Sequence, residues 1–529
     1  MKRYVASQAA RGIWLFALVM IAVGKIRGAN PFESTAELST PCNGIDQIVF
    51  RKLEALNIAP ARLCSDAVFV RRVYLDLTGT LPTAFEAERF ILDHNPGKRM
   101  ALIEQLLARD EFADYLALKW GDLLRIKAEF PINLWPNAAQ AYHRWVRQAL
   151  RDNKPMDQFA RELLTARGSN FDAPPVNFYR AMQNRTPTGI AQAVALTFLG
   201  ERADQWPSNR LQNLATFFAN IGYKSTGEWK EEIVFFNTGS TNTGALNGSP
   251  REAVFPDGSP VTLAPDKDPR EVFAEWLVCQ PAFSRNIANR AWSWLLGRGI
   301  INEPDDIRPD NPPSNPELVA FLAKAFISSR YDFKALYRMI LDSETYQLAA
   351  ISHNNSAEVA ANFAAYPLRR VEAEVLIDMV DQITGSNEHY SSAIPEPYTF
   401  IPDTLRSVAL PDGSITSSFL EMFGRPPRDT GLESERNNRI SASQKLFLLN
   451  SSQLQRKIEA SRMVAFQSST NRAPAEMVRG MYLGILSRFP TGAELETAQG
   501  YIKSGIGKRQ AAIDLAWALM NSAEFLYRH

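Results

Sequence analysis

Apolar residues recur at intervals of three and four along most of the chain, and this spacing constrains the fold more than any other feature. Four segments have it clearly: 101–107, 112–124, 142–150 and 159–164. The interval places apolar side chains on one face of an α-helix. Residues 189–199 are apolar and small almost throughout, which favours a buried helix, and we expect a further helix over 211–221.

The composition changes near residue 228. Residues 233–236 are β-prone, and the sequence Pro256-Asp257-Gly258-Ser259 lies between apolar residues, as in a hairpin turn. Helical spacing resumes near residue 267. At about 100–200 residues per domain, a chain of 529 residues is long enough for two or three domains. We therefore predict a mainly α fold, with helical domains over 45–227 and 267–529 and a β-containing linker over 228–266.

An internal repeat joins the two ends of the chain. Eight of nineteen positions are identical when residues 70–88 are placed over 478–496 without a gap. In both copies Pro-Thr is followed by a glutamate three residues after the threonine, the spacing of a helix capping box. The repeat is either a duplicated interaction module or a helical hairpin used twice for packing.

The N-terminus has the pattern of an export signal. Lys2, Arg3 and Arg11 precede an apolar run over 13–23, and charged residues follow it. The run is about half of the roughly 20 residues that a membrane span needs. We predict that residues 1–29 are a signal peptide, with an uncleaved anchor as the alternative, and that the protein is exported to the periplasm or cell envelope.

The charge and cysteine content exclude several classes. Lys and Arg total 58 against 57 acidic residues, without a basic stripe, so we expect no nucleic-acid partner. Cys42 and Cys64 are close enough in sequence to pair, and Cys279, in an apolar run, is expected to be buried. No CxxC, CxxCH or paired-histidine spacing occurs. The sequence therefore predicts no haem, zinc or other cofactor.

Two groups of charged residues are candidates for chemistry. Asp305 and Asp306 lie in a proline-containing loop, and Glu372 opens a predicted helix, so they are the candidate catalytic acids. The other interpretation of these acids is turn capping and local ion pairing. Acids in such a loop can also hold a metal, but the alternating-ligand pattern of a calcium loop is absent from this segment.

Arginines of the second half are the candidate ligand-binding residues. Arg370, Arg425 and Arg428, with Asp429, lie in or next to a segment poor in helix signals. Guanidinium groups bind carboxylate, sulfate and phosphate through paired hydrogen bonds, which predicts a pocket for an anionic ligand. An internal lattice of salt bridges is the alternative.

Tryptophans are plentiful, and such rings form sugar-binding clefts. They include Trp120, Trp135, Trp145, Trp229, Trp276, Trp292 and Trp294. Most of them occur at helical spacing, which favours a place in the core.

Several motifs together resemble a known bacterial family. They are Val70–Gly79 (VRRVYLDLTG), 120–125 (WGDLLR), 177–180 (NFYR), 289–292 (NRAW), 297–299 (GRG), 369–374 (RRVEAE) and 517–525 (WALMNSAEF). This pattern is similar to the paired domains of unknown function of planctomycete cytochrome-c-associated proteins. Many members carry CxxCH after Phe-Leu-Gly, whereas Phe198-Leu199-Gly200 here is followed by a segment without Cys or His.

The resemblance implies an exported protein whose genetic neighbours often encode a sulfatase-like protein of the alkaline-phosphatase fold. We expect an envelope accessory protein that binds either a partner of that kind or an anionic polysaccharide. The alternative is a polysaccharide hydrolase that uses the carboxylates of the second domain. A redox role, suggested by the family's cytochromes, is disfavoured because CxxCH is absent.

Overall fold

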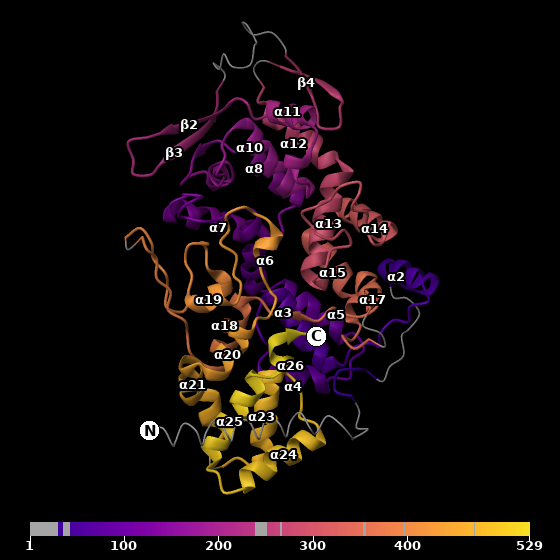
Figure 1. Ribbon diagram of the computed structural model, residues 1–529, viewed down its shortest axis with the longest axis vertical. Helices are drawn as coiled ribbons and strands as arrows, with labels where there is room; N and C mark the ends of the chain where they lie inside the picture. Colours follow the sequence, from indigo (N-terminus) through magenta and orange to yellow (C-terminus); the bar gives the residue numbers. More distant parts are fainter. Residues whose placement is uncertain are drawn as a thin grey trace.

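The computed structural model describes residues 30–34, 43–237, 251–264, 267–352, 356–394, 397–469 and 471–529. Helices hold 56% of the described residues and strands 6%, which confirms the predicted mainly α class. The molecule is elongated, with strands β2 (Ile221–Ser225), β3 (Glu232–Phe236) and β4 (Arg251–Val254) at one end and helix α24 (Gly492–Lys503) at the other (Figure 1). The predicted signal segment 1–29 and Cys42 lie outside the described residues.

The first half of the chain is a run of helices that follows the predicted apolar spacing. They are α2 (Gly44–Ala55), α3 (Asp66–Thr78), α4 (Ala84–Leu92), α5 (Lys98–Leu107), α6 (Asp110–Leu123), α7 (Pro136–Arg151), α8 (Met156–Thr165), α9 (Asn177–Arg180), α10 (Pro187–Val194) and α11 (Ser208–Thr216). The helix expected over 211–221 is wrong at its end, because α11 stops at Thr216 and Ile221 begins a strand that pairs with Phe236.

The strands of the middle segment form two small antiparallel sheets. One has the order β1 (Gly168–Ser169), β3 (Glu232–Phe236), β2 (Ile221–Ser225), and the other pairs β4 (Arg251–Val254) with β5 (Pro260–Leu263). The Pro-Asp-Gly-Ser turn joins β4 to β5, as predicted. Strands therefore lie between the two helical parts of the chain.

The second half returns to helices. They are α12 (Pro269–Cys279), α13 (Pro281–Leu296), α14 (Pro316–Ser328), α15 (Phe333–Leu341), α16 (Glu344–Gln347), α17 (Ala357–Ala361), α18 (Ala373–Thr384), α19 (Ser418–Met422), α20 (Ala442–Asn450), α21 (Ser452–Glu459), α22 (Arg462–Gln467), α23 (Pro474–Leu486), α24 (Gly492–Lys503), α25 (Lys508–Met520) and α26 (Ala523–Leu526). A two-stranded sheet pairs β6 (Arg369–Arg370) with β7 (Tyr527–Arg528). This pairing brings the end of the chain beside α3 at the middle of the molecule (Figure 1).

Two hydrophobic cores organise these elements. One contains buried residues from 45 to 366, and the other contains residues from 371 to 526 together with four residues of the first half. Those four are Leu75, Leu81, Tyr115 and Leu118. Helices α3 and α6 therefore pack on both cores and join them, and residues on both sides of the predicted boundary near 267 share the first core.

The internal repeat folds as two copies of one helical hairpin. Thr83 caps α4 in a capping box with Glu86, and Thr491 caps α24 in a capping box with Glu494, as the sequence predicted. Helix α23 of the second copy packs against α4 of the first. The copies therefore pack together inside the molecule.

The repeat also reproduces an arginine–tyrosine–glutamate contact from different sequence positions. Arg109 binds Glu86 at 2.7 Å and lies over the Tyr74 ring, and Arg488 binds Glu494 at 2.8 Å and lies over the Tyr482 ring. Arg488 directly follows α23, whereas Arg109 follows α5. The contact is thus kept although the arginine comes from a different element in each copy.

The expectation that Cys279 is buried is wrong. Its side chain is exposed at the end of α12, because Leu277 and Val278 are the residues of this turn that face the core. Cys64 is buried and free. Among the described residues, no helix is long and apolar enough to cross a membrane.

Candidate functional site

A buried cluster of charges joins the two halves at α3, α6 and the strand pair β6–β7. We call it the junction network and define it as Asp76, Tyr115, Lys119, Arg369, Glu372 and Arg528. It contains two carboxylates and three cations. The ion pairs Lys119–Glu372, Arg369–Asp76 and Arg528–Asp76 join the first half of the chain to the second, and the ion pair Glu372–Arg528 lies within the second half.

Asp76 is the most enclosed member of the junction network. Its side chain is 0% exposed and accepts four hydrogen bonds. The donors are Arg369 at 2.7 Å, Arg528 at 2.6 Å, and the hydroxyl groups of Tyr346 and Tyr366 at 2.8 and 2.9 Å. Burial of a carboxylate is costly unless it is paired and hydrogen-bonded in this way.

Glu372, a predicted catalytic acid, lies beside Asp76. Lys119 donates to its Oε1 at 2.5 Å and Arg528 to its Oε2 at 2.5 Å. Burial by itself raises the pKa of Glu372, but the charges of Arg528 and Lys119 hold that pKa well below its usual value. A carboxyl group of this kind stays ionised and is a poor proton donor at neutral pH.

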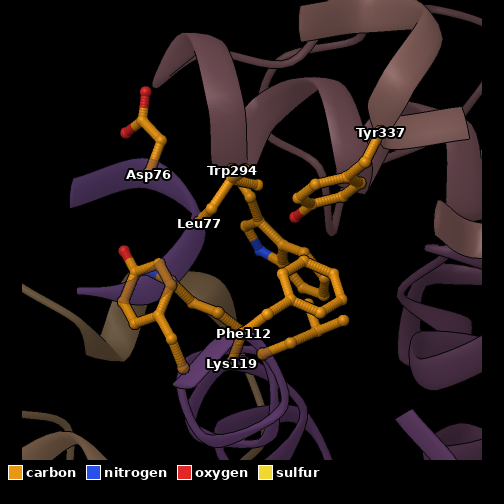
Figure 2. Close-up of a pocket in the computed structure, with 8 residues that line it drawn as sticks. Asp76, Leu77, Phe112, Lys119, Trp294 and Tyr337 are labelled. Carbon is orange, nitrogen blue, oxygen red and sulfur yellow. The ribbon is translucent and has the colours of Figure 1, made fainter. Parts of the chain in front are cut away.

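The cavity next to the junction network is small. Asp76, Lys119, Trp294 and Tyr337 are among its lining residues, and its volume is about 10 Å³. That volume is close to the space needed for one water molecule. Figure 2 shows the Asp76 carboxylate turned away from the rings of Trp294 and Tyr337. The cavity does not have room for a sugar ring.

A second charge cluster lies next to the junction network on α6 and α18. Arg436 bridges two carboxylates, donating to Asp122 at 2.8 Å and to Glu374 at 2.7 Å. Arg428 binds Asp122 at 2.9 Å and is 0% exposed. Burial by itself raises the pKa of Glu374, but Arg436 and Arg425 hold it at about 2.

The three predicted ligand-binding arginines are thus inside the protein, and Asp429 is half-buried. Arg370 donates to the carbonyl groups of Phe423 and Asn437, and Arg425 donates to those of Ile415 and Asp412. Arg428 has the ion pair with Asp122, and Lys127 binds Asp429 at 2.6 Å. These contacts match the salt-bridge lattice that the sequence left open. Ligand binding by these residues stays a prediction.

The two aspartates of the proline-containing loop separate in space. Asp305 is 1% exposed and binds Arg290 of α13 at 2.7 Å, whereas Asp306 binds Arg308 nearer the surface. The backbone N–H of Glu433 donates to Asp305. Burial and the charge of Asp305 raise the pKa of Glu433.

The tryptophans divide between the core and the surface. Trp120 and Trp292 are fully buried. Trp135 and Trp229 instead meet Tyr398, with ring centroids 5.9 Å apart for Trp135–Trp229 and 5.9 Å apart for Trp135–Tyr398. Trp229 and Tyr398 stack at 6.4 Å, and Lys230 lies 5.0 and 5.3 Å from the centroids of Trp135 and Trp229. We call these four residues the aromatic platform.

Metal ligands are not gathered in the described part of the chain. No group of three or more His, Cys, Asp or Glu side chains is placed there to hold a metal ion. His143 is buried in α7, where burial and nearby arginines lower its pKa to about 3, so its ring is neutral at physiological pH.

Comparison with known families shows which family the chain belongs to. The family model PSCyt2, "Protein of unknown function (DUF1549)", matches residues 44–222, and PSD1, "Protein of unknown function (DUF1553)", matches residues 269–502. The chain belongs to the planctomycete cytochrome-associated two-domain family. No curated protein and no solved structure matches it.

Three of the motifs on which the sequence resemblance rests lie at the junction network. Asp76 lies in the 70–79 motif, Arg369 and Glu372 lie in the 369–374 motif, and Arg528 lies three residues after the 517–525 motif. These three segments and α6, which supplies Tyr115 and Lys119, together form one buried cluster.

Sequence reasoning missed the partners of the candidate residues. Asp122 lies in the 120–125 motif and Arg436 lies close to the arginine-rich segment, but nothing local indicated that they pair, or that Lys119 pairs with Glu372. For Asp76 the sequence did contain a clue to burial. Helix α3 has apolar residues around its whole circumference, so a charged residue on it is expected to be buried. A fully apolar helix is buried, so its charged residues need buried partners.

Proposed function

We propose that this member of the two-domain family is an exported envelope accessory protein that binds an anionic polysaccharide without catalysing its cleavage. The observation that carries the proposal is the pairing of the candidate acids. Glu372 is bound by Lys119 and Arg528, and Asp305 is bound by Arg290. Acid–base hydrolysis needs two carboxylates facing one substrate bond, with separated pKa values.

The ion pairs across α3 and α6 also support a binding role. They hold the two helical parts as one body, which suits a protein that presents a preformed surface. Export remains part of the proposal through the charged and apolar pattern of residues 2–27.

A partner protein is the second ligand class, and one observation favours it. Leu446 and Leu449 of α20 are 61% and 45% exposed, and Met422 at the end of α19 is 38% exposed. Phe447 of α20 packs on Phe419 of α19, so the two helices share this surface. Apolar patches of this kind mark protein contacts. The sulfatase-like protein suggested by the family resemblance is the partner to test.

The hydrolase alternative has one observation in its favour, the raised pKa of Glu433 beside Asp305. Its weakness is that Asp305 is enclosed and ion-paired, so substrate would have to displace Arg290.

The test is a thermal-shift panel with sulfated, uronic and neutral glycans, and with the sulfatase-like protein. A ligand that binds the folded state alone raises the melting temperature. We expect a shift with anionic glycans and no release of reducing ends. Release that is lost in both Glu433→Gln and Asp305→Asn would establish the hydrolase instead. A shift with the protein partner alone would replace the polysaccharide proposal.

A further inference from the structure

The aromatic platform brings together three segments that are far apart in the chain. Trp135 directly precedes α7, Trp229 and Lys230 lie in the turn between β2 and β3, and Tyr398 follows α18. Trp229 is 61% exposed and Tyr398 is 39% exposed. Exposed large aromatic side chains gathered in one place are a mark of a binding surface.

Trp135 adopts a backbone conformation that tryptophan rarely takes. Its φ is 73° and its ψ is 147°, a region populated almost entirely by glycine. Such a conformation is strained and persists only where the surroundings enforce it. Strain of this kind is concentrated at ligand-binding sites, so it is a second and independent indication of function.

The loop around Trp135 is fixed from both sides. The Ala128 N–H donates to Asp412 at 2.8 Å, and the Glu129 N–H donates to Ser414 at 2.9 Å. The Trp135 N–H donates to the Ala128 carbonyl at 3.0 Å, and Leu134 is fully buried. The ring is therefore held in place before any ligand arrives.

The turn that carries Trp229 and Lys230 is also fixed. Thr226 donates to Glu231 at 2.6 Å, Ser169 donates to the same carboxylate at 2.5 Å, and Asn170 donates to the Lys230 carbonyl at 3.2 Å. A preformed site binds with a smaller loss of conformational entropy.

The positive charge of Lys230 favours an anionic ligand over a cationic one. The Lys230 ammonium lies against both indole rings, and no carboxylate of the described residues forms an ion pair with it. A cationic ligand is repelled because that place already holds a cation. A pyranose ring presents a C–H face to an aromatic ring, and a carboxylate or sulfate on the sugar complements Lys230.

We propose that Trp135, Trp229, Tyr398 and Lys230 form a binding site for an anionic, pyranose-based polysaccharide. The inference rests on the proposed function and assigns it to this surface. Trp229 and Tyr398 supply the stacking faces, Trp135 supports both rings edge-on, and Lys230 binds the acidic group.

The test measures binding of polygalacturonate, chondroitin sulfate and dextran to the full-length protein by affinity electrophoresis and calorimetry. We expect the wild type to bind at least one of the two anionic polymers and to bind dextran more weakly. Trp229→Ala and Tyr398→Ala should each lower the affinity at least tenfold. Lys230→Gln should remove the preference over dextran, and comparison of the two anionic polymers distinguishes carboxylate from sulfate recognition.

Phe85→Ala is the matched control, because Phe85 is 70% exposed on α4 and lies outside the platform. Its affinity should stay within twofold of the wild type, and all variants should keep the wild-type melting temperature. Wild-type binding that survives both Trp229→Ala and Tyr398→Ala would overturn the site while leaving the proposed function intact. A wild type that binds neither anionic polymer would overturn both proposals.

Discussion

Removal of the negative charge of Asp76 tests whether the junction network holds the two halves together. Asp76→Asn keeps the shape of the side chain but leaves three cations, Lys119, Arg369 and Arg528, facing the single carboxylate of Glu372. Loss of one partner from a buried ion pair costs about 3–5 kcal/mol. We expect the free energy of unfolding to fall by that amount.

Arg528→Met should be less costly, although it also removes a fully buried charge. Two cations then face two carboxylates, and the pairs Arg369–Asp76 and Lys119–Glu372 remain. The variant loses hydrogen bonds to charged groups, which should lower the free energy of unfolding by about 1.5–3 kcal/mol. The predicted order of destabilisation is therefore Asp76→Asn above Arg528→Met.

The measurement is urea unfolding at pH 7, followed by tryptophan fluorescence and circular dichroism. Arg479→Met is the control, since Arg479 is exposed on α23 and its substitution should change stability by about 0.5 kcal/mol or less. The reasoning is refuted if Asp76→Asn loses less than about 1 kcal/mol, or if Arg528→Met proves the more damaging of the two.

Three further predictions test local features. Thr491→Ala should lower the free energy of unfolding by about 1 kcal/mol in urea titration, because it removes the cap of α24, and Thr491→Ser should not. Burial raises the pKa of Asp378 to about 6, so ionisation of this group lowers the free energy of unfolding as pH rises from about 4 through 6. The loss should be roughly 2–3 kcal/mol when unfolding of the wild type is compared at pH 4 and pH 7. Asp378→Asn should lack this loss. A maleimide should modify Cys279 in the native protein well before Cys64, as peptide mass spectrometry would report, and equal rates would contradict the described exposure.

The sequence was informative wherever the cause of structure is local. The spacing of apolar residues placed most helices of the first half, and the Pro-Asp-Gly-Ser turn placed the β4–β5 hairpin. The Thr–Glu spacing of the repeat predicted both capping boxes, since a cap needs groups three residues apart. Local patterns failed where tertiary contacts decide, as at Ile221, which pairs with Phe236 in a strand.

At the candidate site, too, the sequence indicated local features but not tertiary contacts. Residue types pointed to Glu372 and Arg428 as notable charges, but no pattern indicated that Lys119 and Asp122 would bind them from more than 250 residues away. The sequence named Trp135 and Trp229 among the rings that can bind sugars, but it did not indicate that they meet Tyr398, because the three residues belong to separate segments.

The sequence by itself determined the mainly α class, the duplicated hairpin and the family, since these depend on periodicity, caps and short motifs. Only the tertiary structure decided which charges are buried in pairs and which rings meet at the surface. The physical reason is that burial and ion pairing depend on how α3, α6 and the loops around them pack. Contacts of that kind join residues hundreds of positions apart, and local spacing carries no record of them.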